Sequence, residues 1–222
     1  MRKTLFALAS LIAATQAHAF TYFNDFESPV GGEWSSTGTT TFGTSTVLGR
    51  FSNNTVQLTL TGLTVGHTAT IKFDFFALDS WDGASGPDRF IFSVDGVTKL
   101  DTTFSNVGFN SQNYPDAFGG GSYNAQTGAD DTDLSHGGTL PNGYYGNSVY
   151  KFGGLGSNAA FTAVASSSTM VLSFNVNGLQ DISDESWALD NVSVNTSAVP
   201  EPVSMLAIGL GLTGLLRRKK NR

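Results

Sequence analysis

The sequence predicts an all-β protein whose body is a sandwich of two antiparallel sheets. Apolar and polar residues alternate with a period of two along several stretches, which places one side of each strand in a core and the other toward water. Glycine supplies 26 of the 222 residues and charged residues only 14%, a composition unlike that of helical bundles. No stretch of the body shows a helical period of useful length, so we expect sheets throughout.

The strand signals follow one another along the body. Alternation is clearest over residues 56–60, 69–75 and 170–176, where every second residue is Ala, Ile, Leu, Met, Phe or Val. Between residues 90 and 100 two apolar runs flank Asp95-Gly96, which predicts a β-hairpin. The segment from Ser105 to Ser148 is rich in Gly, Asn, Asp, Ser and Tyr and hardly alternates. We expect a long loop that buries little surface itself and either binds a ligand or is disordered.

Charge is distributed unevenly along the chain. Seven of the 12 basic residues lie at the two ends, so residues 20–199 hold 5 basic and 17 acidic residues, a net charge of −12. So acidic a body repels phosphate backbones, and we therefore expect no nucleic-acid partner. The chain has no cysteine, which excludes disulfides, thiolate metal sites and cysteine nucleophiles.

The N-terminus has the three parts of a secretory signal peptide. Arg2 and Lys3 precede an apolar run over residues 5–14, and Ala17-His18-Ala19 follows. Cleavage after Ala19 would make Phe20 the first mature residue. We therefore expect a signal helix over residues 1–19 and a sandwich domain over residues 20–196. The alternative is that the N-terminal run forms a first buried helix.

Residues 197–222 have the features of a second targeting signal, with three parts in a fixed order. An apolar stretch over residues 203–216 would make about 21 Å of helix, short for a membrane span, and the basic residues after it would stay in the cytoplasm. The motif before the stretch consists of Val199, Pro200, Glu201 and Pro202. This order resembles the PEP-CTERM sorting signal of Gram-negative bacteria. The resemblance implies a short transmembrane helix held transiently in the inner membrane, and an exosortase that cuts near the motif and releases the protein to the cell surface or beyond. A permanent C-terminal anchor is the alternative.

The two ends of the body carry the clearest candidate metal site. Asp25 and Glu27 open the body, and alternation in the closing strand places Asp190 on the same side as Val192 and Val194. A carboxylate on an apolar face is costly unless it is paired or bound to metal, and no basic residue lies nearby in the sequence. Ca²⁺, which takes six to eight oxygen ligands, would compensate. Alternatively the strand is bulged or flipped, so that Asp190 faces solvent.

The same pairing resembles a family pattern. Phe26-Glu27 near the first strand, Trp34 soon after and Asp190-Asn191-Val192 in the last strand are similar to jelly-roll carbohydrate-binding modules and the related concanavalin-like sandwiches. The resemblance implies jelly-roll topology and a structural Ca²⁺ held by Glu27 and Asp190, with Asp25 near it. It also implies that the body contacts extracellular polysaccharide.

A second acidic cluster lies between two predicted strands. Asp79 and Asp82 stand three residues apart beside a glycine, which suits a Ca²⁺ loop, although the spacing is not that of an EF-hand. Trp81 between them either offers a flat face to a sugar or is tucked into the core. Tyr144 and Tyr145 would add amphipathic rings to a sugar site. Whether the similar segment at residues 184–187 approaches this loop in space stays open.

Catalysis has poor support in the sequence. The two histidines of the mature body, His67 and His136, stand in no triad or metalloprotease pattern. A glycosidase needs two carboxylates flanking a cleft, and the glutamate signature of concanavalin-like glucanases is absent. We therefore expect a non-enzymatic, exported surface or matrix protein that is stabilised by Ca²⁺ and binds polysaccharide. The alternatives are a secreted polysaccharide hydrolase on the same fold and a ligand-free structural protein of the envelope or biofilm.

Overall fold

The computed structural model describes residues 19–42, 45–132, 147–154, 156 and 158–197. One compact unit spans Ala19–Ser197. The expected signal helix, the apolar C-terminal stretch, the motif at residues 199–202 and the rings of Tyr144 and Tyr145 lie outside the described residues. Within the described part of the chain, no helix is long and apolar enough to cross a membrane.

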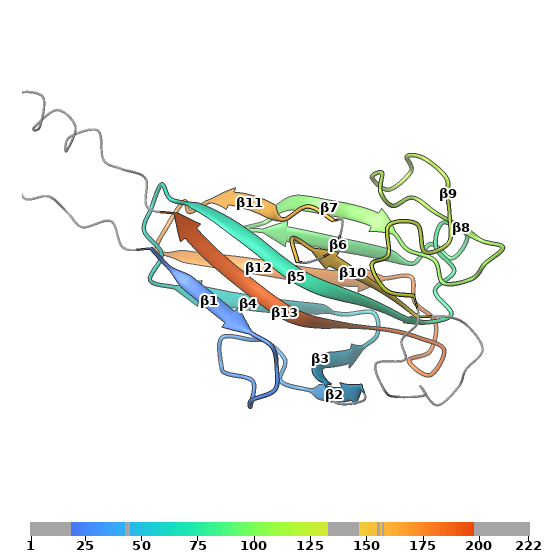
Figure 1. The fold of residues 1–222 in the computed structure, drawn as a ribbon, viewed down its shortest axis with the longest axis horizontal. Coiled ribbons are helices and arrows are strands. Elements are labelled where there is room, and N and C mark those ends of the chain that lie inside the picture. The colour runs from blue at the N-terminus through green and yellow to red at the C-terminus, as the bar shows by residue number, and fades with distance from the viewer. Residues whose placement is uncertain (1–18, 43–44, 133–146, 155, 157, 198–222) are drawn as a thin grey trace, which may run out of the picture. The chain divides into compact units, whose positions relative to one another are not determined.

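The described body is built from strands and loops, which confirms the all-β class (Figure 1). The strands are β1 (Thr21–Asn24), β2 (Thr39–Phe42), β3 (Ser45–Phe51), β4 (Thr55–Thr61), β5 (Thr68–Asp79), β6 (Arg89–Val94), β7 (Val97–Thr103), β8 (Ser111–Gln112), β9 (Tyr123–Asn124), β10 (Ser148–Phe152), β11 (Phe161–Val164), β12 (Thr169–Asn177) and β13 (Glu185–Ser197).

Two antiparallel sheets pack face to face, so the body is a β-sandwich as the sequence predicts. The first sheet has seven strands in the order β10-β5-β13-β3-β2, with β1 paired to β13 and β11 paired to β5. The second sheet has four strands in the order β4-β12-β6-β7. A small sheet of β8 and β9 stands apart from both at one end of the body, as Figure 1 shows.

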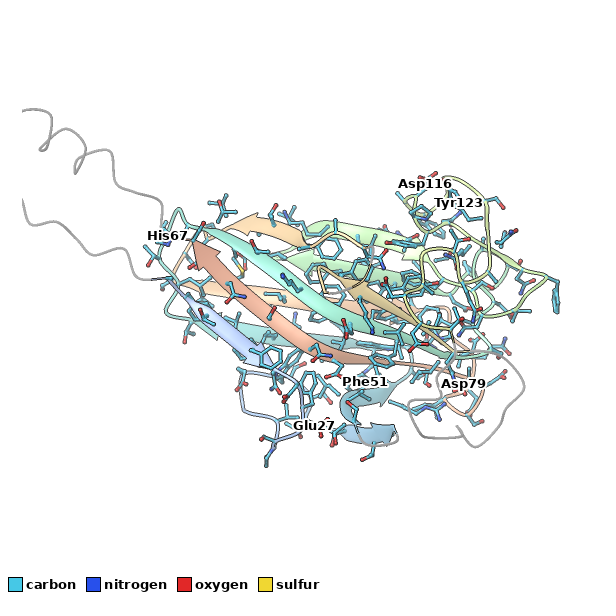
Figure 2. The ribbon with its side chains drawn as sticks, in the orientation of Figure 1. Glu27, Phe51, His67, Asp79, Asp116 and Tyr123 are labelled. Carbon is cyan, nitrogen blue, oxygen red and sulfur yellow. The ribbon has the colours of Figure 1, made fainter. Side chains whose placement is uncertain are left out.

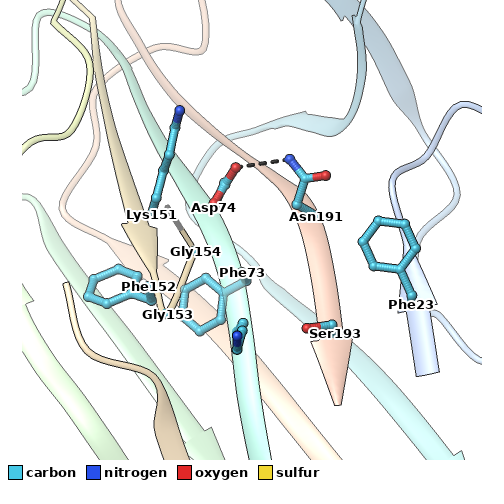
Figure 3. Close-up of a pocket in the computed structure, with 10 residues that line it drawn as sticks. Phe23, Phe73, Asp74, Lys151, Phe152, Gly153, Gly154, Asn191 and Ser193 are labelled. Atoms are coloured by element: carbon cyan, nitrogen blue, oxygen red, sulfur yellow. Dashed lines mark hydrogen bonds between the residues drawn. The ribbon is translucent and has the colours of Figure 1, made fainter. Parts of the chain in front are cut away.

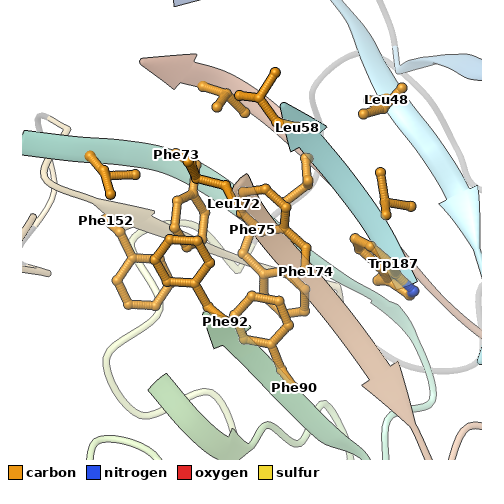
Figure 4. Packing of buried hydrophobic residues seen from close by; sticks show 14 of the residues in the cluster. Leu48, Leu58, Phe73, Phe75, Phe90, Phe92, Phe152, Leu172, Phe174 and Trp187 are labelled. Atoms are coloured by element: carbon orange, nitrogen blue, oxygen red, sulfur yellow. The ribbon is translucent and has the colours of Figure 1, made fainter. Parts of the chain in front are cut away.

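Aromatic rings fill the space between the two sheets (Figure 4). Phe73 of β5 meets Phe174 of β12 with ring centroids 5.1 Å apart, and Phe75 meets Phe90 of β6 at 4.0 Å. Each of these side chains is at most 1% exposed. Full burial of a phenylalanine contributes about 1.5–3 kcal/mol, so the stacked rings are a large part of what holds the sheets together.

The predicted strands and hairpin are confirmed where the sequence alternates. Along β4 exposed and buried residues alternate without exception, and the same period runs through most of β12. The turn between β6 and β7 is formed by Asp95 and Gly96, with φ angles of 49° and 77°. Positive φ at both central residues is what a type I′ turn requires, which explains why this dipeptide predicts the hairpin.

The second half of β5 is buried on both faces of the sheet, which its alternation alone does not predict. Residues 73–78 are all buried. Phe73, Phe75 and Ala77 face the main core, so Phe76 and Leu78 lie on the outer face. There they belong to a second small apolar cluster made of Val47, Phe76, Leu78, Val149 and Ala188.

A β-bulge in β13 changes the side that Asp190 takes. Asp190 pairs with Asp74 and Ser193 pairs with Lys72, so two residues of β13 oppose one residue of β5. Asn191 takes up the extra length with a left-handed φ of 50°. Because paired residues point to the same side and Asp74 lies between two core phenylalanines, Asp190 lies on the outer face.

The expectation that Asp190 shares a face with Val192 and Val194 is therefore wrong. Trp187 and Leu189 join the two valines in the core, because the bulge reverses the alternation between them. The bulged alternative is confirmed, but Asp190 does not face open solvent, since only 6% of it is exposed.

The segment predicted to be a long loop packs tightly over its described part, residues 105–132. Gln112 is fully buried, and its Oε1 accepts hydrogen bonds from the backbone of Ser105 and Gln126. Tyr114 packs in the core, its ring centroid 5.3 Å from that of Tyr150. The expectation that this segment buries little surface is thus wrong for these residues.

Candidate functional site

The turn after β1 carries the first two predicted metal ligands. Phe26 has a left-handed φ of 55° and buries its ring against Trp34, with centroids 5.4 Å apart. Because Phe26 is anchored in the core, its neighbours stay nearer the surface: Asp25 is half-buried and Glu27 is exposed. Asn24 fixes the turn, since its Oδ1 accepts a hydrogen bond of 2.8 Å from the Phe26 amide.

The Glu27 carboxylate is hydrogen-bonded to the beginning of β3. Its Oε1 accepts hydrogen bonds from the Thr46 amide at 2.7 Å and the Ser45 hydroxyl at 3.2 Å. The Thr46 amide is the main reason that the pKa of Glu27 lies below its ordinary value. Glu27 also lines a pocket of about 490 Å³ formed by the turn, β2 and β3. Figure 2 shows where Glu27 lies in the body. At neutral pH this carboxylate is therefore ionised.

Asp190 lies in the bulge, in surroundings that disfavour the ionised form of its carboxyl group. Its Oδ1 accepts a 2.7 Å hydrogen bond from the Asn191 amide, and Asn191 Nδ2 bridges Asp190 Oδ2 at 3.3 Å and Asp74 Oδ2 at 2.9 Å. Burial raises the pKa of Asp190 to about 7, and the negative charges of Asp74, Glu27 and Asp25 push it in the same direction. We call Asp25, Glu27, Asp74 and Asp190 the bulge cluster.

The bulge cluster brings the three predicted ligands Asp25, Glu27 and Asp190 into one electrostatic neighbourhood. All of its members offer oxygen, which is the donor that Ca²⁺ prefers. Among the described residues, however, no three His, Asp or Glu side chains stand together as a ready-made metal cage. A bound cation would require the exposed turn to move its carboxylates toward Asp190.

The other predicted calcium loop is not assembled as expected. Asp79 accepts a hydrogen bond from Arg50 Nη2 in a partly buried ion pair, so its charge already has a partner. Asp82 instead accepts hydrogen bonds from Asn110 at 2.9 Å and Gln180 at 3.2 Å. The two carboxylates thus serve different contacts, which corrects the expectation that they share one ion.

Trp81 is a core residue. It is fully buried, packs edge-on against Phe75 at 5.7 Å and donates its indole N–H to the Ser186 carbonyl at 2.8 Å. Its ring has no face left for a ligand. The expectation that Trp81 stacks on a sugar is therefore wrong, and the alternative of a tryptophan tucked into the core is confirmed.

The segment at residues 184–187 does approach this loop, the point left open by the sequence. The Ser80 amide and hydroxyl donate to Asp184 at 3.0 Å and 2.8 Å. The approach buries Glu185 close enough to Asp88 for each carboxyl group to influence the pKa of the other. We call them the sealed pair.

The sealed pair is almost completely shielded from water. Asp88 is 1% exposed, and its Oδ2 accepts from the amides of Asp82 and Gly83. Glu185 is 0% exposed; its Oε2 accepts from the Gln180 amide at 2.5 Å, while its Oε1 is buried without a partner among the described residues. Burial, followed by the charges of Asp88 and Asp82, raises the pKa of Glu185, and burial likewise raises that of Asp88. The pair therefore retains a proton well above the ordinary range of carboxyl groups.

The described residues thus define an antiparallel sandwich with two separate acidic neighbourhoods. Beyond it, residues 198–220 match the PEP-CTERM protein-sorting motif. The motif indicates an exported protein that is processed by an exosortase, with transient anchoring in the membrane before release at the surface or outside the cell. No curated protein sequence matches the chain.

Two solved structures show remote similarity to the chain. Dimeric latent PorU from Porphyromonas gingivalis is 13% identical, with a TM-score of 0.42, over 83% of this chain and 13% of that one. The mosquito-larvicidal Cry4Aa toxin from Bacillus thuringiensis is 12% identical, with a TM-score of 0.33, over 77% of this chain and 22% of that one. The chain spans a small part of each, and likeness at this level carries no inference about function.

Proposed function

We propose that the protein is a non-enzymatic surface or matrix protein whose sandwich binds extracellular polysaccharide and is stabilised by Ca²⁺. The observation that carries the proposal is the sorting motif, which begins at residue 198, directly after β13 ends at Ser197. The sandwich would therefore be the part of the protein that remains after exosortase processing. The resemblance of Phe26-Glu27, Trp34 and Asp190-Asn191-Val192 in the sequence to the pattern of jelly-roll carbohydrate-binding modules supports polysaccharide as the ligand class.

The calcium part of the proposal rests on the bulge cluster. Asp190 is buried among other carboxylates and its pKa is raised, so the hydrogen bonds from Asn191 compensate its ionised form only in part. Ca²⁺ bound by Asp190 and Glu27, with Asp25 near them, would supply that compensation through hard oxygen ligands. The ion would be structural, holding the first turn of the body against its last strand.

The non-enzymatic part is supported by where the acid groups lie. A hydrolase requires a carboxyl group with a raised pKa that reaches its substrate. The three carboxyl groups with the largest rise in pKa are Asp88, Glu185 and Asp190; the first two are at most 1% exposed and Asp190 only 6%, so a polysaccharide has little access to them. The alternative of a secreted hydrolase would have to place its chemistry elsewhere.

Mass spectrometry of the extracellular fraction tests the export route. We expect an N-terminal peptide that starts at Phe20 and a C-terminus that lacks residues 217–222. Recovery of the intact basic tail outside the cell would contradict exosortase processing. Recovery of the full-length chain only in the membrane fraction would favour a permanent anchor.

A glycan array probed with the secreted protein, with and without chelator, tests the binding role. Retention on some polysaccharides, weakened by chelator, is the expected result. Release of reducing sugar from a retained polysaccharide would favour the hydrolase. Absence of any retention would favour the ligand-free structural protein.

A further inference from the structure

The few basic side chains of this acidic body fall into two groups, those in ion pairs with carboxylates and those outside such pairs. The two arginines are engaged with carboxylates, Arg50 with Asp79 and Arg89 with Asp101. Among the described residues, the three lysines Lys72, Lys99 and Lys151 form no ion pair of this kind. Two of these three lysines line one pocket, which is unexpected where acidic residues outnumber basic ones 17 to 5.

This lysine pocket lies on the outer face of the first sheet and has a volume of about 460 Å³. Its main lining residues are Phe23, Lys72, Asp74, Lys151, Asn191 and Ser193 (Figure 3). They come from β1, β13, β5 and β10, which are neighbours in the sheet although far apart in the sequence. Four adjacent strands span about 14 Å, so the pocket is wide enough for more than a small ion.

The two lysines are placed to act on one ligand group. Lys151 pairs with Asp74, and Lys72 is two residues from Asp74 on the same face of β5. Such diagonal neighbours lie about 7–8 Å apart, within the reach of two long and flexible side chains. Asp74 between them is already hydrogen-bonded by Asn191 Nδ2, so it moderates the positive charge without cancelling it.

Two glycines keep this side of the pocket open. At Gly153, where φ is 70°, a Cβ would come within 2.5 Å of Ala160 Cβ and 2.9 Å of Lys72 Cγ, so glycine makes room for both. At Gly154 a Cβ would lie 3.5 Å from Lys151 Cβ and 3.7 Å from Asp74 Oδ1. Residue 154 therefore borders the space beside the charged groups, and a longer side chain there would occupy it.

The opposite wall is apolar. Phe23 stands across the pocket from Lys151 and Asp74, with Asn191 and Ser193 between them (Figure 3). Phe23 is 59% exposed, so its ring is available to a ligand. The Asn191 amide is held in place by the bulge, and the Ser193 hydroxyl adds a second hydrogen-bonding group beside the ring.

Together these groups select for a particular ligand chemistry. A flat apolar ring suits the face of a sugar, and the amide and hydroxyl suit its hydroxyl groups. Two ammonium groups suit an anion, which a neutral sugar lacks, whereas a bare inorganic anion has no use for the phenylalanine. We propose that the lysine pocket binds an acidic sugar unit, a uronate or a sulfated sugar, with its anionic group at Lys72 and Lys151 and its ring against Phe23. The proposal rests on the polysaccharide-binding role proposed above and names its site and substrate class.

Calorimetric titration of the secreted protein tests the proposal with alginate and polygalacturonate as acidic probes and dextran as the neutral probe. We expect the acidic polymers to bind, dextran not to bind, and affinity to fall as sodium chloride rises from about 50 to 500 mM. Lys72→Gln, Lys151→Gln and Phe23→Ala should each weaken binding about tenfold, the scale of one charge-assisted or stacking contact. Lys99→Gln on β7 makes the same charge change outside the pocket and should leave affinity unchanged.

Gly154→Leu provides a second, independent variant. It keeps every charge and should abolish binding by filling the pocket, with an unchanged melting temperature as the control for folding. If Lys72→Gln proves unstable through its packing against Gly153, this variant and Lys151→Gln still decide the outcome.

Each contrary outcome overturns a different statement. Equal losses of affinity in Lys99→Gln and Lys151→Gln would show that the polymers bind by non-specific charge attraction and would exclude the lysine pocket as the site. Binding to dextran alone would remove the acidic-sugar inference while leaving the proposed polysaccharide-binding role intact. Absence of binding to any glycan would remove both, and preferential binding to anionic lipid vesicles would replace the ligand with a membrane surface.

Discussion

The bulge cluster and the sealed pair solve the same electrostatic problem in different ways. Both place carboxyl groups out of water and beside other carboxyl groups, which raises the pKa of Asp190 in one and of Glu185 in the other. The bulge cluster borders an exposed turn that a hydrated cation can reach. The sealed pair is at most 1% exposed, in a region where Trp81 donates to the Ser186 carbonyl and Gln180 to Glu185, so a proton neutralises it rather than a hydrated cation. What distinguishes the candidate metal site from the buried carboxyl pair is therefore whether a hydrated ion can reach the carboxylates, not how many carboxylates there are.

The largest expected effect tests how firmly the sealed region is closed. Trp81→Ala should lower stability by about 3–5 kcal/mol, because it removes a fully buried indole and leaves the Ser186 carbonyl without its donor. Phe109→Ala is the matched control, since Phe109 is 86% exposed and its loss should cost less than about 0.5 kcal/mol. Urea denaturation measures both. A small effect at Trp81 would mean that this region opens readily to solvent.

Calcium should act on the bulge cluster alone. At a hundredfold excess over Kd, a cation that binds only the native state adds about 2.7 kcal/mol. For a domain of this size the melting temperature should rise by about 5–10 °C. Asp190→Ala should remove the response and Glu185→Gln should keep it. The same melting temperature in calcium and in chelator, with elemental analysis showing that the chelated protein is metal-free, would exclude the calcium site.

The pH dependence of stability should separate the two neighbourhoods. A carboxyl group whose pKa is raised in the folded state contributes stability in full below its ordinary pKa and loses it as pH rises through the folded value. For Asp190 the loss falls between about pH 3.8 and 7, at up to about 1.4 kcal/mol per pH unit. For Glu185 it begins near 4.5 and extends upward.

Denaturation in chelator from pH 5 to 8 measures this slope. Asp190→Asn and Glu185→Gln should each flatten it. Calcium should remove only the part that is due to Asp190, because the ion keeps that carboxylate ionised. If calcium also abolished the Glu185 part, the sealed pair would be open to cations and the distinction between the two regions would fail.

The smallest expected effect concerns Asp82, in the second of the two calcium sites that the sequence predicts. Asp82→Asn should change stability by less than about 0.5 kcal/mol, because Asp82 is partly exposed and, within the described part of the chain, its carboxylate bonds only to the side-chain amides of Asn110 and Gln180. The calcium response should stay the same. A lost response would restore this loop as a metal site.

Local patterns in the sequence are sufficient for the strands with the clearest alternation and for the hairpin. Alternation around Leu58 and Leu172 and the Asp95-Gly96 turn depend on neighbours a few residues away, and each was confirmed. The bulge at Asn191 was predicted only as an alternative, since its signal is one asparagine, a residue that tolerates left-handed φ, inside an alternating run.

The side-chain partnerships were beyond local patterns. Asp79 finds Arg50 29 residues earlier in the chain, and the sealed pair joins residues 88 and 185. Lys72 and Lys151 share a pocket because β10 pairs with β5. In the chain these two strands are separated by β6 and β7, which belong to the second sheet. Such contacts follow from the order of strands in the sheet, which alternation does not specify.

The position of β13 has a mechanical consequence for a protein held by its tail. β13 is hydrogen-bonded to β5 along one edge and to β1 and β3 along the other, and the chain leaves it at Ser197 toward the sorting motif. The bonds of an antiparallel ladder run perpendicular to the strands, so a pull along β13 loads many of them at once rather than one after another. While the tail is still anchored, drag on the exported body is thus borne in shear by the middle of the larger sheet. Such a strand resists extraction, and tension is more readily relieved by cutting the tail than by unravelling the sandwich.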